Sequence, residues 1–374
     1  MANKLKIGFI GGGINSVVGN THRIASQMDN RWELVAGCFS KDQNINHQTG
    51  LLWSVKNVYD DWQLLLENEK NNLDAVSVLT PTNLHFEMVK KAIEMGYSVI
   101  CEKTLTSIFS EANIISNIAK ENNSFVAVIN NYTGYPMLRE LKEMIKLNKL
   151  GKIHHIQVEM PQEGFIRYAN NNKPKPQSWR LKDYQIPTIY LDLAIHLHHI
   201  VSFLIKNKPL EVCAAHQSYG FFNDIIDNAT CMANYSDNVS CQIWFSKSAL
   251  GSRNGLKIRL YGDIGSAEWL QMESEYIKFC DKQGRIEIID RASPNIIIAN
   301  QDRYNRFKAG HPAGFIEAFA NYYYDLADAV LDFQKNKIIE NKWIVTSDLA
   351  KEAMGMLDSM ALSVKNKTWK NVQQ

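Results

Sequence analysis

A short apolar strand that runs directly into a cluster of glycines is the feature that most constrains the fold of this chain. Residues 6–19 read KIGFIGGGINSVVG, so three consecutive glycines follow the apolar residues. Residues without a Cβ allow the main chain to turn sharply and to approach a pyrophosphate, whose charge then lies at the positive end of the following helix. The segment therefore predicts a strand, turn and helix that hold a dinucleotide.

The glycine pattern departs from the usual dinucleotide-binding fingerprint at its third position. Gly11 and Gly13 supply the first two glycines of G-x-G-x-x-G, whereas Ser16 stands at the third and Gly19 follows three residues later. An ordinary tight turn between a strand and a helix gives a similar sequence, so the prediction depends on the rest of the chain. The expected cofactor contacts in this turn are Gly11, Gly12, Gly13, Ile14 and Asn15.

Length and composition predict a globular protein of about two domains. The chain has 374 residues, and its 41 basic residues nearly balance 39 acidic ones, so no strong field favours nucleic acid or a membrane as a partner. No apolar run approaches the roughly 20 residues that cross a bilayer, and we expect no signal sequence. The six cysteines are scattered without a C-x-x-C pair, which favours reduced thiols and a cytoplasmic location.

Short apolar segments alternate with helical patterns in the first part of the chain. This alternation predicts a parallel sheet with helices on both faces. Apolar residues recur at helical spacing over 84–95 and 110–121. The strands are expected at 6–10, 33–39, 75–79, 98–101 and 125–129.

After about residue 131 the pattern changes to alternating strand-like segments separated by short turns, which predict a largely antiparallel sheet. One long helix, expected over 188–205 after Pro187, interrupts them, and two more are expected over 315–333 and 346–364. Residues 170–177, rich in asparagine and proline, predict an exposed loop. The strands are expected at 153–159, 210–215, 230–235, 239–245, 256–261 and 266–271.

The predicted architecture is an α/β fold in two domains. Residues 1–131 are expected to form a Rossmann dinucleotide-binding domain. Residues 132–374 are expected to form an α+β domain with a large, mainly antiparallel open sheet that binds substrate and joins the subunits of a homodimer or homotetramer. The last helices could pack back on the first domain.

Lys103 follows one of the predicted parallel strands, at the edge of the sheet where ligands bind. In open α/β sheets, ligands gather at the carboxyl ends of the strands. A lysine there could donate a proton or a hydrogen bond to a substrate oxygen. A solvated lysine after a strand has the same local sequence, so both interpretations stay open.

Asp192 and His196 are four residues apart on the long predicted helix, which places them on one face. A carboxylate that orients an imidazole makes a base suited to proton transfer near neutral pH. Two alternatives stay open: an ion pair on the helix surface, and metal ligation by Asp192, His196 and His199. No further carboxylate or cysteine has convincing ligand spacing, so we expect no metal.

Further polar residues are placed to contact a cofactor or a substrate. Residues 80–85, TPTNLH, follow a predicted strand, where side chains and a helix amino terminus could meet ribose or phosphate, although a capped helix start explains them too. Trp179 and Arg180 could pair a ring face with a guanidinium for a polyol or a phosphate, or brace the loop. His22 is expected on the first helix in a structural role. The expected cofactor contacts are Thr80, Pro81, Asn83 and His85, and the candidate pocket residues are Gln162, Tyr168, Trp179 and Arg180.

In this order, and over nearly the whole chain, these residues resemble the Gfo/Idh/MocA family of oxidoreductases, the group of glucose-fructose oxidoreductase and inositol dehydrogenase. The resemblance implies an amino-terminal Rossmann domain and a carboxy-terminal α/β domain on an open sheet. It also implies hydride transfer between a nicotinamide cofactor and a hydroxyl-bearing carbon of a sugar, polyol or related compound. The matching elements are the glycine turn with His22, residues 80–85, Glu102-Lys103, Asn131-Tyr132, Trp179-Arg180, Asp192 to His196, and residues 310–312.

Three residues take catalytic roles by this resemblance. Lys103 matches the lysine of the family's Glu-Lys-Pro motif, and Asp192 and His196 match its D-x-x-x-H motif. The resemblance implies that His196 accepts the alcohol proton, Asp192 orients it and Lys103 polarises the same oxygen. Glu102 and Asn131 join the expected cofactor contacts on the same ground.

Departures from the family pattern concern the cofactor. Thr104 stands where the family usually has proline, so a cis bond fixed by that proline cannot be assumed, and the extension before Gly19 leaves the closing of the pyrophosphate loop open. No clear acid ends the second strand. Ser40 and Lys41 could accept a 2′-phosphate, although Asp42 could turn inward. The cofactor is therefore NAD or NADP, with a slight preference for accepting NADP.

The function expected from the sequence is that of an NAD(P)-dependent dehydrogenase or reductase acting on a sugar, a sugar derivative or an inositol-like polyol. An alternative is a non-catalytic protein that senses a dinucleotide or sugar on the same fold. The joint presence of Lys103, Asp192 and His196 argues against that alternative. Metal-dependent hydrolysis at His196 and His199 ranks last. The exact substrate and the direction of reaction are not specified by the sequence.

Overall fold

A computed structural model describes residues 4–374, which divide by their contacts into two compact units. The first takes in the chain up to Gly134 together with Phe315–Lys351, and the second takes in Tyr135–Gly314 and Glu352–Gln374. Helix α8 (Phe315–Asn336) therefore belongs with the first unit, although the whole first segment of the second unit precedes it in the chain. The expected domain boundaries, 1–131 and 132–374, stay a prediction.

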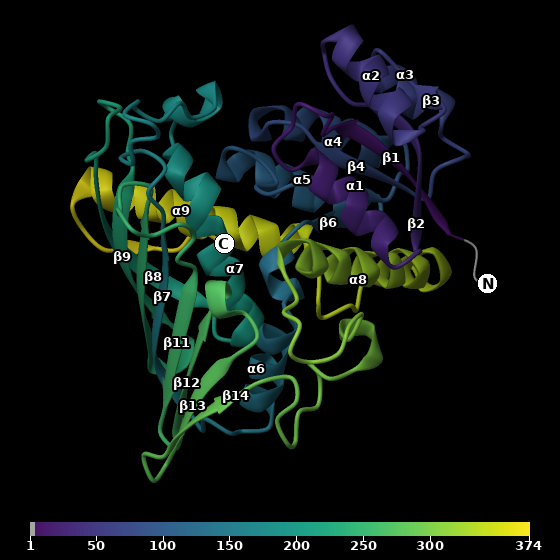
Figure 1. Cartoon of the computed structure of the whole chain (residues 1–374). Coiled ribbons are helices and arrows are strands. Elements are labelled where there is room, and N and C mark those ends of the chain that lie inside the picture. The colour runs from purple at the N-terminus through teal and green to yellow at the C-terminus, as the bar shows by residue number, and fades with distance from the viewer. Residues whose placement is uncertain (1–3) are drawn as a thin grey trace. The chain divides into compact units, whose positions relative to one another are not determined.

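The first unit is built on a seven-stranded sheet whose strands alternate with helices (Figure 1). Its strands are β1 (Leu5–Gly11), β2 (Trp32–Cys38), β3 (Asn57–Val58), β4 (Ala75–Leu79), β5 (Val99–Cys101), β6 (Val126–Val128) and β15 (Val345–Thr346). The order is β15-β6-β5-β4-β1-β2-β3, all parallel except β15, which pairs antiparallel with β6. This order is that of a doubly wound dinucleotide-binding fold, so the predicted Rossmann sheet is confirmed.

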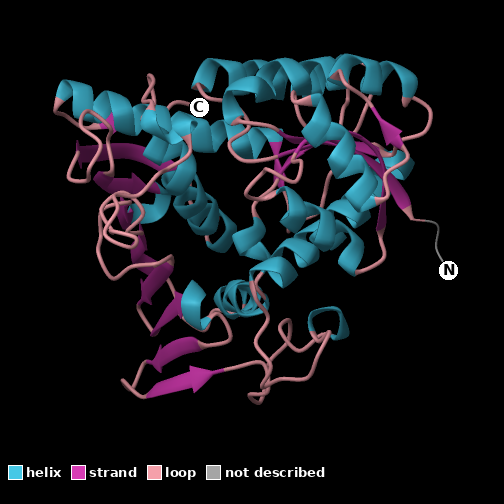
Figure 2. Ribbon diagram, turned by 45° about the horizontal axis from the view of Figure 1, so that its top comes forward, coloured by secondary structure: helices cyan, strands magenta, loops and turns pink. Residues whose placement is uncertain are grey.

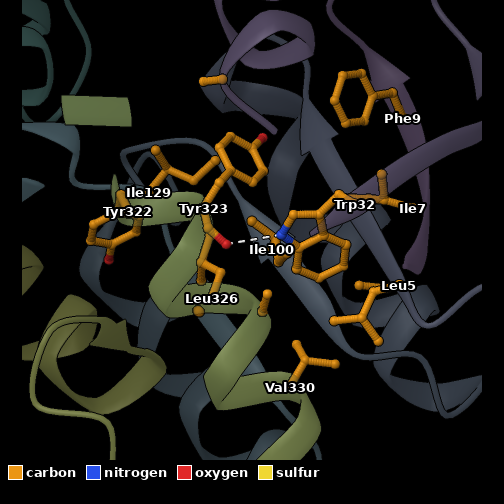
Figure 3. Packing of buried hydrophobic residues seen from close by; sticks show 14 of the residues in the cluster. Leu5, Ile7, Phe9, Trp32, Ile100, Ile129, Tyr322, Tyr323, Leu326 and Val330 are labelled. Carbon is orange, nitrogen blue, oxygen red and sulfur yellow. Dashed lines mark hydrogen bonds between the residues drawn. The ribbon is translucent and has the colours of Figure 1, made fainter. Parts of the chain in front are cut away.

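Helices lie on both faces of this sheet. Besides α8 they are α1 (Gly19–Met28), α2 (Gln43–Trp53), α3 (Trp62–Asn68), α4 (His85–Glu94) and α5 (Phe109–Glu121). Successive strand residues point to opposite faces, so Ile7 and Phe9 join the cluster that contains α8 side chains, whereas Ile10 joins the cluster that contains those of α4 and α5. On the α8 face, Nε1 of Trp32 donates to the main-chain oxygen of Tyr323 at 2.9 Å (Figure 3).

The second unit contains a nine-stranded sheet. Its strands are β7 (Ile153–Pro161), β8 (Pro209–Gln217), β9 (Asn228–Tyr235), β10 (Val239–Ser246), β11 (Lys257–Gly262), β12 (Gly265–Leu270), β13 (Ile277–Asp281), β14 (Ile286–Ile289) and β16 (Lys370–Asn371). They lie in the order β14-β13-β12-β11-β7-β10-β9-β8-β16. Only β7 and β10 pair in parallel among these described strands, so the predicted, mainly antiparallel sheet is confirmed.

Helices cover one face of this second sheet (Figure 2). They are α6 (Pro136–Lys146), α7 (Ile195–Leu204) and the part of α9 (Ser347–Asn366) that belongs to this unit. The main-chain N–H of Ala214 donates to Oγ of Ser363, which ties β8 to α9. The other face has a shallow hollow of about 470 Å³, whose lining includes Met232, Trp244 and Arg259 and none of the predicted site residues.

The helix predicted over 188–205 forms in two parts. Tyr190–Ala194 make a wider, π-helical turn, and α7 continues from Ile195. The main-chain oxygen of Pro187 accepts the N–H of Tyr190 at 2.9 Å, so the helix begins where the proline ends the preceding loop. Within residues 4–374, none of the helices has both the length and the apolar character needed to cross a bilayer.

Candidate functional site

The glycine turn after β1 depends on backbone conformations that side chains rarely allow. Gly11 and Gly12 have φ of +82° and +74°. A Cβ on Gly12 would lie 2.8 Å from Cδ1 of Leu79, and the N–H of Gly13 donates to the main-chain oxygen of Phe39 at 3.1 Å. The turn is therefore packed against the ends of β4 and β2, as a close approach to a pyrophosphate requires.

Gly19 takes the packing role that the fingerprint gives to its third glycine. Helix α1 begins at this residue, and a Cβ there would lie only 1.8 Å from the main-chain oxygen of Gly12. Oγ of Ser16 accepts the N–H of Gly19 at 3.2 Å. The extra residues form a loop in which Ile14 and Asn15 are exposed, so the extended turn still brings a helix amino terminus against the first glycines.

Three further predicted residues lie at the carboxyl edge of the same sheet. Thr80, Lys103 and Asn131 follow β4, β5 and β6, which run in parallel, so their main chains leave the sheet at one edge. The peptide bond between Lys103 and Thr104 is cis, although the second residue is not proline. The structure thus brings the strand-end residues of the first unit to the edge where a dinucleotide binds in this fold.

His85 has a different environment from the other predicted cofactor contacts. Its ring is fully buried, with Nδ1 2.7 Å from the main-chain oxygen of Thr104 and Nε2 2.8 Å from that of Thr80. Burial lowers the pKa of His85, against the opposing effect of these two contacts. The ring braces two strand ends, which favours a structural role, whereas Pro81 and Asn83 beside it are exposed.

The end of β2 presents a hydroxyl and a cation. Oγ of Ser40 accepts the main-chain N–H of Asp42, and the carboxylate of Asp42 accepts the N–H of Ile45 and so caps α2. Lys41 is exposed. Because the only acid in this turn is engaged as a helix cap, Ser40 and Lys41 remain the candidates to meet a 2′-phosphate.

Buried amide groups of the first unit lack partners within the chain. Both amide atoms of Asn130, and Nδ2 of Asn131, have no hydrogen-bond partner among residues 4–374, and both side chains are buried. Buried polar groups are normally paired, so these amides at the end of β6 are exceptions. Their atoms are almost fully covered, so they assign no contact with a ligand.

The second unit holds a buried carboxylate between two cations. Oδ2 of Asp192 lies 2.8 Å from Nζ of Lys247 and accepts from Nε of Arg180 at 3.0 Å. Nζ of Lys247 also donates to Oε1 of Gln162 at 3.2 Å. The side chains of Asp192 and Lys247 are 7% and 9% exposed, so Asp192 lies in a buried polar cluster rather than on a solvated helix surface.

Lys247 was missed by the sequence analysis. It directly follows β10, at a point where a lysine in a sequence is usually solvated. Its main-chain N–H donates to the main-chain oxygen of Asp227 at 2.7 Å, which fixes the residue against the start of β9. No local motif marks it, because its partner Asp192 is far away in the sequence and only the fold joins them.

The predicted aromatic and cationic pair of the loop is present. Cζ of Arg180 lies 4.4 Å from the centroid of the Trp179 ring, and Nη1 of Arg180 donates to Oε1 of Gln177 at 2.6 Å. Tyr168 is 55% exposed and packs edge-on against Phe221. Residues 170–177 are mostly exposed, as the composition predicted.

His196, His198 and His199 are all buried on α7. Nδ1 of His198 lies 2.9 Å from Sδ of Met356, and burial lowers the pKa of His198 to about 4. Among the residues that the structure describes, no group of three or more His, Cys, Asp or Glu side chains is placed to hold a metal ion. The alternative of metal ligation at Asp192, His196 and His199 thus gains no support, since two cations already hold Asp192.

Two family models match the chain, one in each part. Residues 5–130 match the model described as "Oxidoreductase family, NAD-binding Rossmann fold", and residues 138–268 match the "GFO/IDH/MocA C-terminal domain". An uncharacterized oxidoreductase of Bacillus subtilis, YfiI, is 29% identical over 344 residues, which cover 88% of this chain and 86% of that protein. A levoglucosan dehydrogenase of Pseudarthrobacter phenanthrenivorans is 22% identical over 57% of this chain and 59% of that protein.

A solved structure is similar over almost the full length. The inositol dehydrogenase homolog of Azotobacter vinelandii, in complex with NADH and myo-inositol, superimposes with a TM-score of 0.90 at 25% sequence identity. The alignment covers 99% of this chain and 98% of that chain. The similarity extends through both units, including the segments that carry Lys103, Asp192 and His196.

Proposed function

Because the chain belongs to the Gfo/Idh/MocA family of NAD-binding oxidoreductases, we propose that it transfers hydride between a nicotinamide dinucleotide and a hydroxyl-bearing carbon of a sugar, sugar derivative or inositol-like polyol. The observation that carries the proposal is the buried Asp192 carboxylate, held by Arg180 and Lys247 four residues before His196. A buried carboxylate with charged partners, close in the sequence to a buried imidazole, supplies the two kinds of group that an acid–base site uses. The similar proteins are named for inositol, a polyol, and levoglucosan, a sugar derivative.

The first unit supplies the cofactor contacts in this proposal. The turn of Gly11, Gly12, Gly13, Ile14 and Asn15 meets the pyrophosphate, and Thr80, Pro81, Asn83, Glu102 and Asn131 lie at the edge near the nicotinamide and its ribose. Ser40 and Lys41 lie at the adenosine ribose, so we expect NADP to be accepted beside NAD. The bound cofactor supplies the hydride acceptor or donor.

The catalytic step divides between three residues. His196 accepts the proton of the substrate hydroxyl during oxidation, and Asp192, held by Arg180 and Lys247, orients the imidazole. Lys103 donates a hydrogen bond to the same oxygen and stabilises the charge that develops there. Gln162, Trp179 and Arg180 line the polyol, with Trp179 offering an apolar ring face to its C–H groups.

The test compares variants in a hydride-transfer assay. We expect purified protein to reduce NAD+ with a member of a panel that includes myo-inositol and levoglucosan. Lys103→Met and His196→Asn should each lower kcat at least about a hundredfold, with the Kd for NADH within about threefold of the parent value. Full activity in both variants would overturn the assigned roles. Tight NADH binding without turnover across the panel would favour the alternative of a non-catalytic protein that senses a dinucleotide or sugar. His47→Asn, at an exposed position in α2, is the control.

We also propose that the open face of the second sheet joins subunits into a homodimer or homotetramer. This face exposes Met232 at 51% and carries the hollow that Trp244 and Arg259 line. Sedimentation equilibrium tests it: a monomer at micromolar concentration would contradict the proposal, and Met232→Lys should weaken the association. The cytoplasmic location stays a prediction from the sequence.

A further inference from the structure

A buried series of polar contacts leads from α8 to the residue beside Lys103. The hydroxyl of Tyr323 lies 3.0 Å from Nδ1 of His22, and Nε2 of His22 lies 3.1 Å from Oε1 of Glu102. The other oxygen of Glu102 accepts the main-chain N–H of Lys103 at 3.0 Å. The ring of His22 therefore bridges a phenol and a carboxylate, and the carboxylate reaches the backbone of the predicted catalytic lysine.

This arrangement lies in surroundings where charge interactions are strong. His22 is 0% and Tyr323 1% exposed, and the side chain of Glu102 is 13% exposed. Removing a carboxylate from water costs free energy unless it gains partners. One carboxylate oxygen of Glu102 contacts His22 and the other accepts the N–H of Lys103, and a low local dielectric strengthens each contact.

The contacts decide the protonation state of Glu102. Burial alone would raise the pKa of Glu102, but the contact with His22 and the charge of Lys103 outweigh burial and hold the pKa below its usual value. The titratable groups that act on Glu102 or feel its charge are His22 from α1, His85 from α4, Tyr323 from α8, and Cys101 and Lys103 beside it in the chain.

We propose that Glu102 is a positioning residue, held by His22 and Tyr323, that fixes the main chain of Lys103 at the end of β5 for hydride transfer. The inference rests on the proposed function, in which the Lys103 ammonium polarises the substrate oxygen. Helix α8 thereby contributes to the site through Tyr323, which follows His22 by 301 residues in the chain. A purely structural role for these contacts would lower stability without lowering kcat more than it lowers NADH affinity.

Tyr322 provides a matched control for Tyr323. Its hydroxyl is also buried; it donates to the main-chain oxygen of Val128 at 2.6 Å and accepts the N–H of Val345 at 2.8 Å. Tyrosine to phenylalanine removes one buried hydroxyl in either case, so the two variants should lose similar stability. Only Tyr323→Phe breaks the series that ends at Glu102.

The experiment measures kcat and the Kd for NADH in Glu102→Gln, Tyr323→Phe and Tyr322→Phe, with NAD+ and myo-inositol or levoglucosan. We expect Glu102→Gln to lower kcat about tenfold, because the main-chain N–H of Lys103 and the ring of His22 lose a charged partner. Tyr323→Phe should lower kcat by less, and Tyr322→Phe should leave it unchanged. The Kd for NADH should stay within about threefold of the parent value in all three, because the glycine turn is untouched.

Urea unfolding gives a readout that needs no substrate. The free energy of unfolding should fall by similar amounts in Tyr323→Phe and Tyr322→Phe, so a lower kcat in Tyr323→Phe alone would come from the contacts that end at Lys103. An unchanged kcat in both Glu102→Gln and Tyr323→Phe, or equal kcat values in Tyr323→Phe and Tyr322→Phe, would overturn the inference. Failure of the proposed function looks different, because Lys103→Met would then keep its activity.

Discussion

The two units position their functional groups by different means. In the first unit the main chain does most of this work, because glycines with positive φ, a close helix start at Gly19 and parallel strand ends determine where each group lies. In the second unit side chains do it, because Asp192 takes its place from Arg180 and Lys247, which come from separate segments. A local motif therefore marks the first kind of site, whereas the second kind can be recognised only in the folded chain.

The largest effect should come from adding a single Cβ to the glycine turn of the first unit, where the main chain positions the site. Gly19→Ala would place that atom 1.8 Å from the main-chain oxygen of Gly12. Neither backbone can yield without opening the turn, so we expect the free energy of unfolding to fall by about 3 kcal/mol or more and NADH binding to be lost. NADH fluorescence titration and urea unfolding measure both. Gly164→Ala, where a Cβ would have nothing within 4 Å, is the control, and equal behaviour of the two variants would break the comparison.

Lys247 tests the second unit, in which side chains position the functional carboxylate. Lys247→Met removes one of two cations from the buried Asp192 while keeping most of the side-chain volume. We expect kcat to fall by about a hundredfold, the upper range for losing a hydrogen bond to a charged group, with NADH binding unchanged. The control is Lys257→Met on β11, which removes a half-buried ion-pair partner of Glu268 and should keep full activity. An active Lys247→Met variant would mean that Arg180 alone holds the carboxylate.

A smaller effect concerns stability against pH. Because His198 is buried with a pKa of about 4, while its usual value is 6.5, the unfolded chain binds its proton first as the pH falls. The stability present above pH 6.5 is therefore lost between pH 6.5 and 4. We expect a loss of about 2 kcal/mol from pH 7 to pH 5 by this residue. His198→Gln should remove that part of the slope in urea unfolding, and the exposed His47→Gln should not.

His85 adds to the same slope from the first unit, since burial lowers its pKa as well. The difference between variant and parent, rather than the slope of the parent, therefore isolates His198. An identical slope in His198→Gln and the parent would show that the pKa of His198 is the same in the folded and the unfolded chain.

The smallest effect is expected at Lys41. Its exposed ammonium at the end of β2 is a candidate partner for a 2′-phosphate, and exposed charge pairs are worth roughly 0–1 kcal/mol. Lys41→Glu should therefore lower kcat/KM with NADP+ by about fivefold and leave the value with NAD+ nearly unchanged. Equal effects on the two cofactors would remove Lys41 from the adenosine end of the site.

The sequence predicts the parallel strands and the main helices well, because their apolar residues follow the period of the element. It fails for α2, whose buried residues are Asn46, Thr49 and Gly50, while Leu51 and Leu52 are 81% and 71% exposed. No apolar periodicity indicates such a helix. The edge strand β14 was missed for a related reason. Ile286 and Ile288 are exposed, and none of the residues of this strand is buried, so it shows no alternation of buried and exposed residues.

The candidate site divides in the same way. The glycine turn, Lys103, Asp192 and His196 were found from local sequence or from the family resemblance, and each lies where its element was expected. Lys247 was not, because its role depends on a partner distant in the sequence. The contact between His22 and Glu102 was hidden for the same reason, although both residues had been noted separately.

Helix α8 completes the first unit only after the whole of 135–314 has been made. During synthesis on the ribosome, Trp32, Leu5 and Ile7 must wait for side chains of α8 such as Leu326 and Val330 before that face of the sheet is covered (Figure 3). A nascent chain that has grown only to residue 134 would therefore expose an apolar surface. We expect chaperones to bind this surface until α8 has been synthesised and covers it.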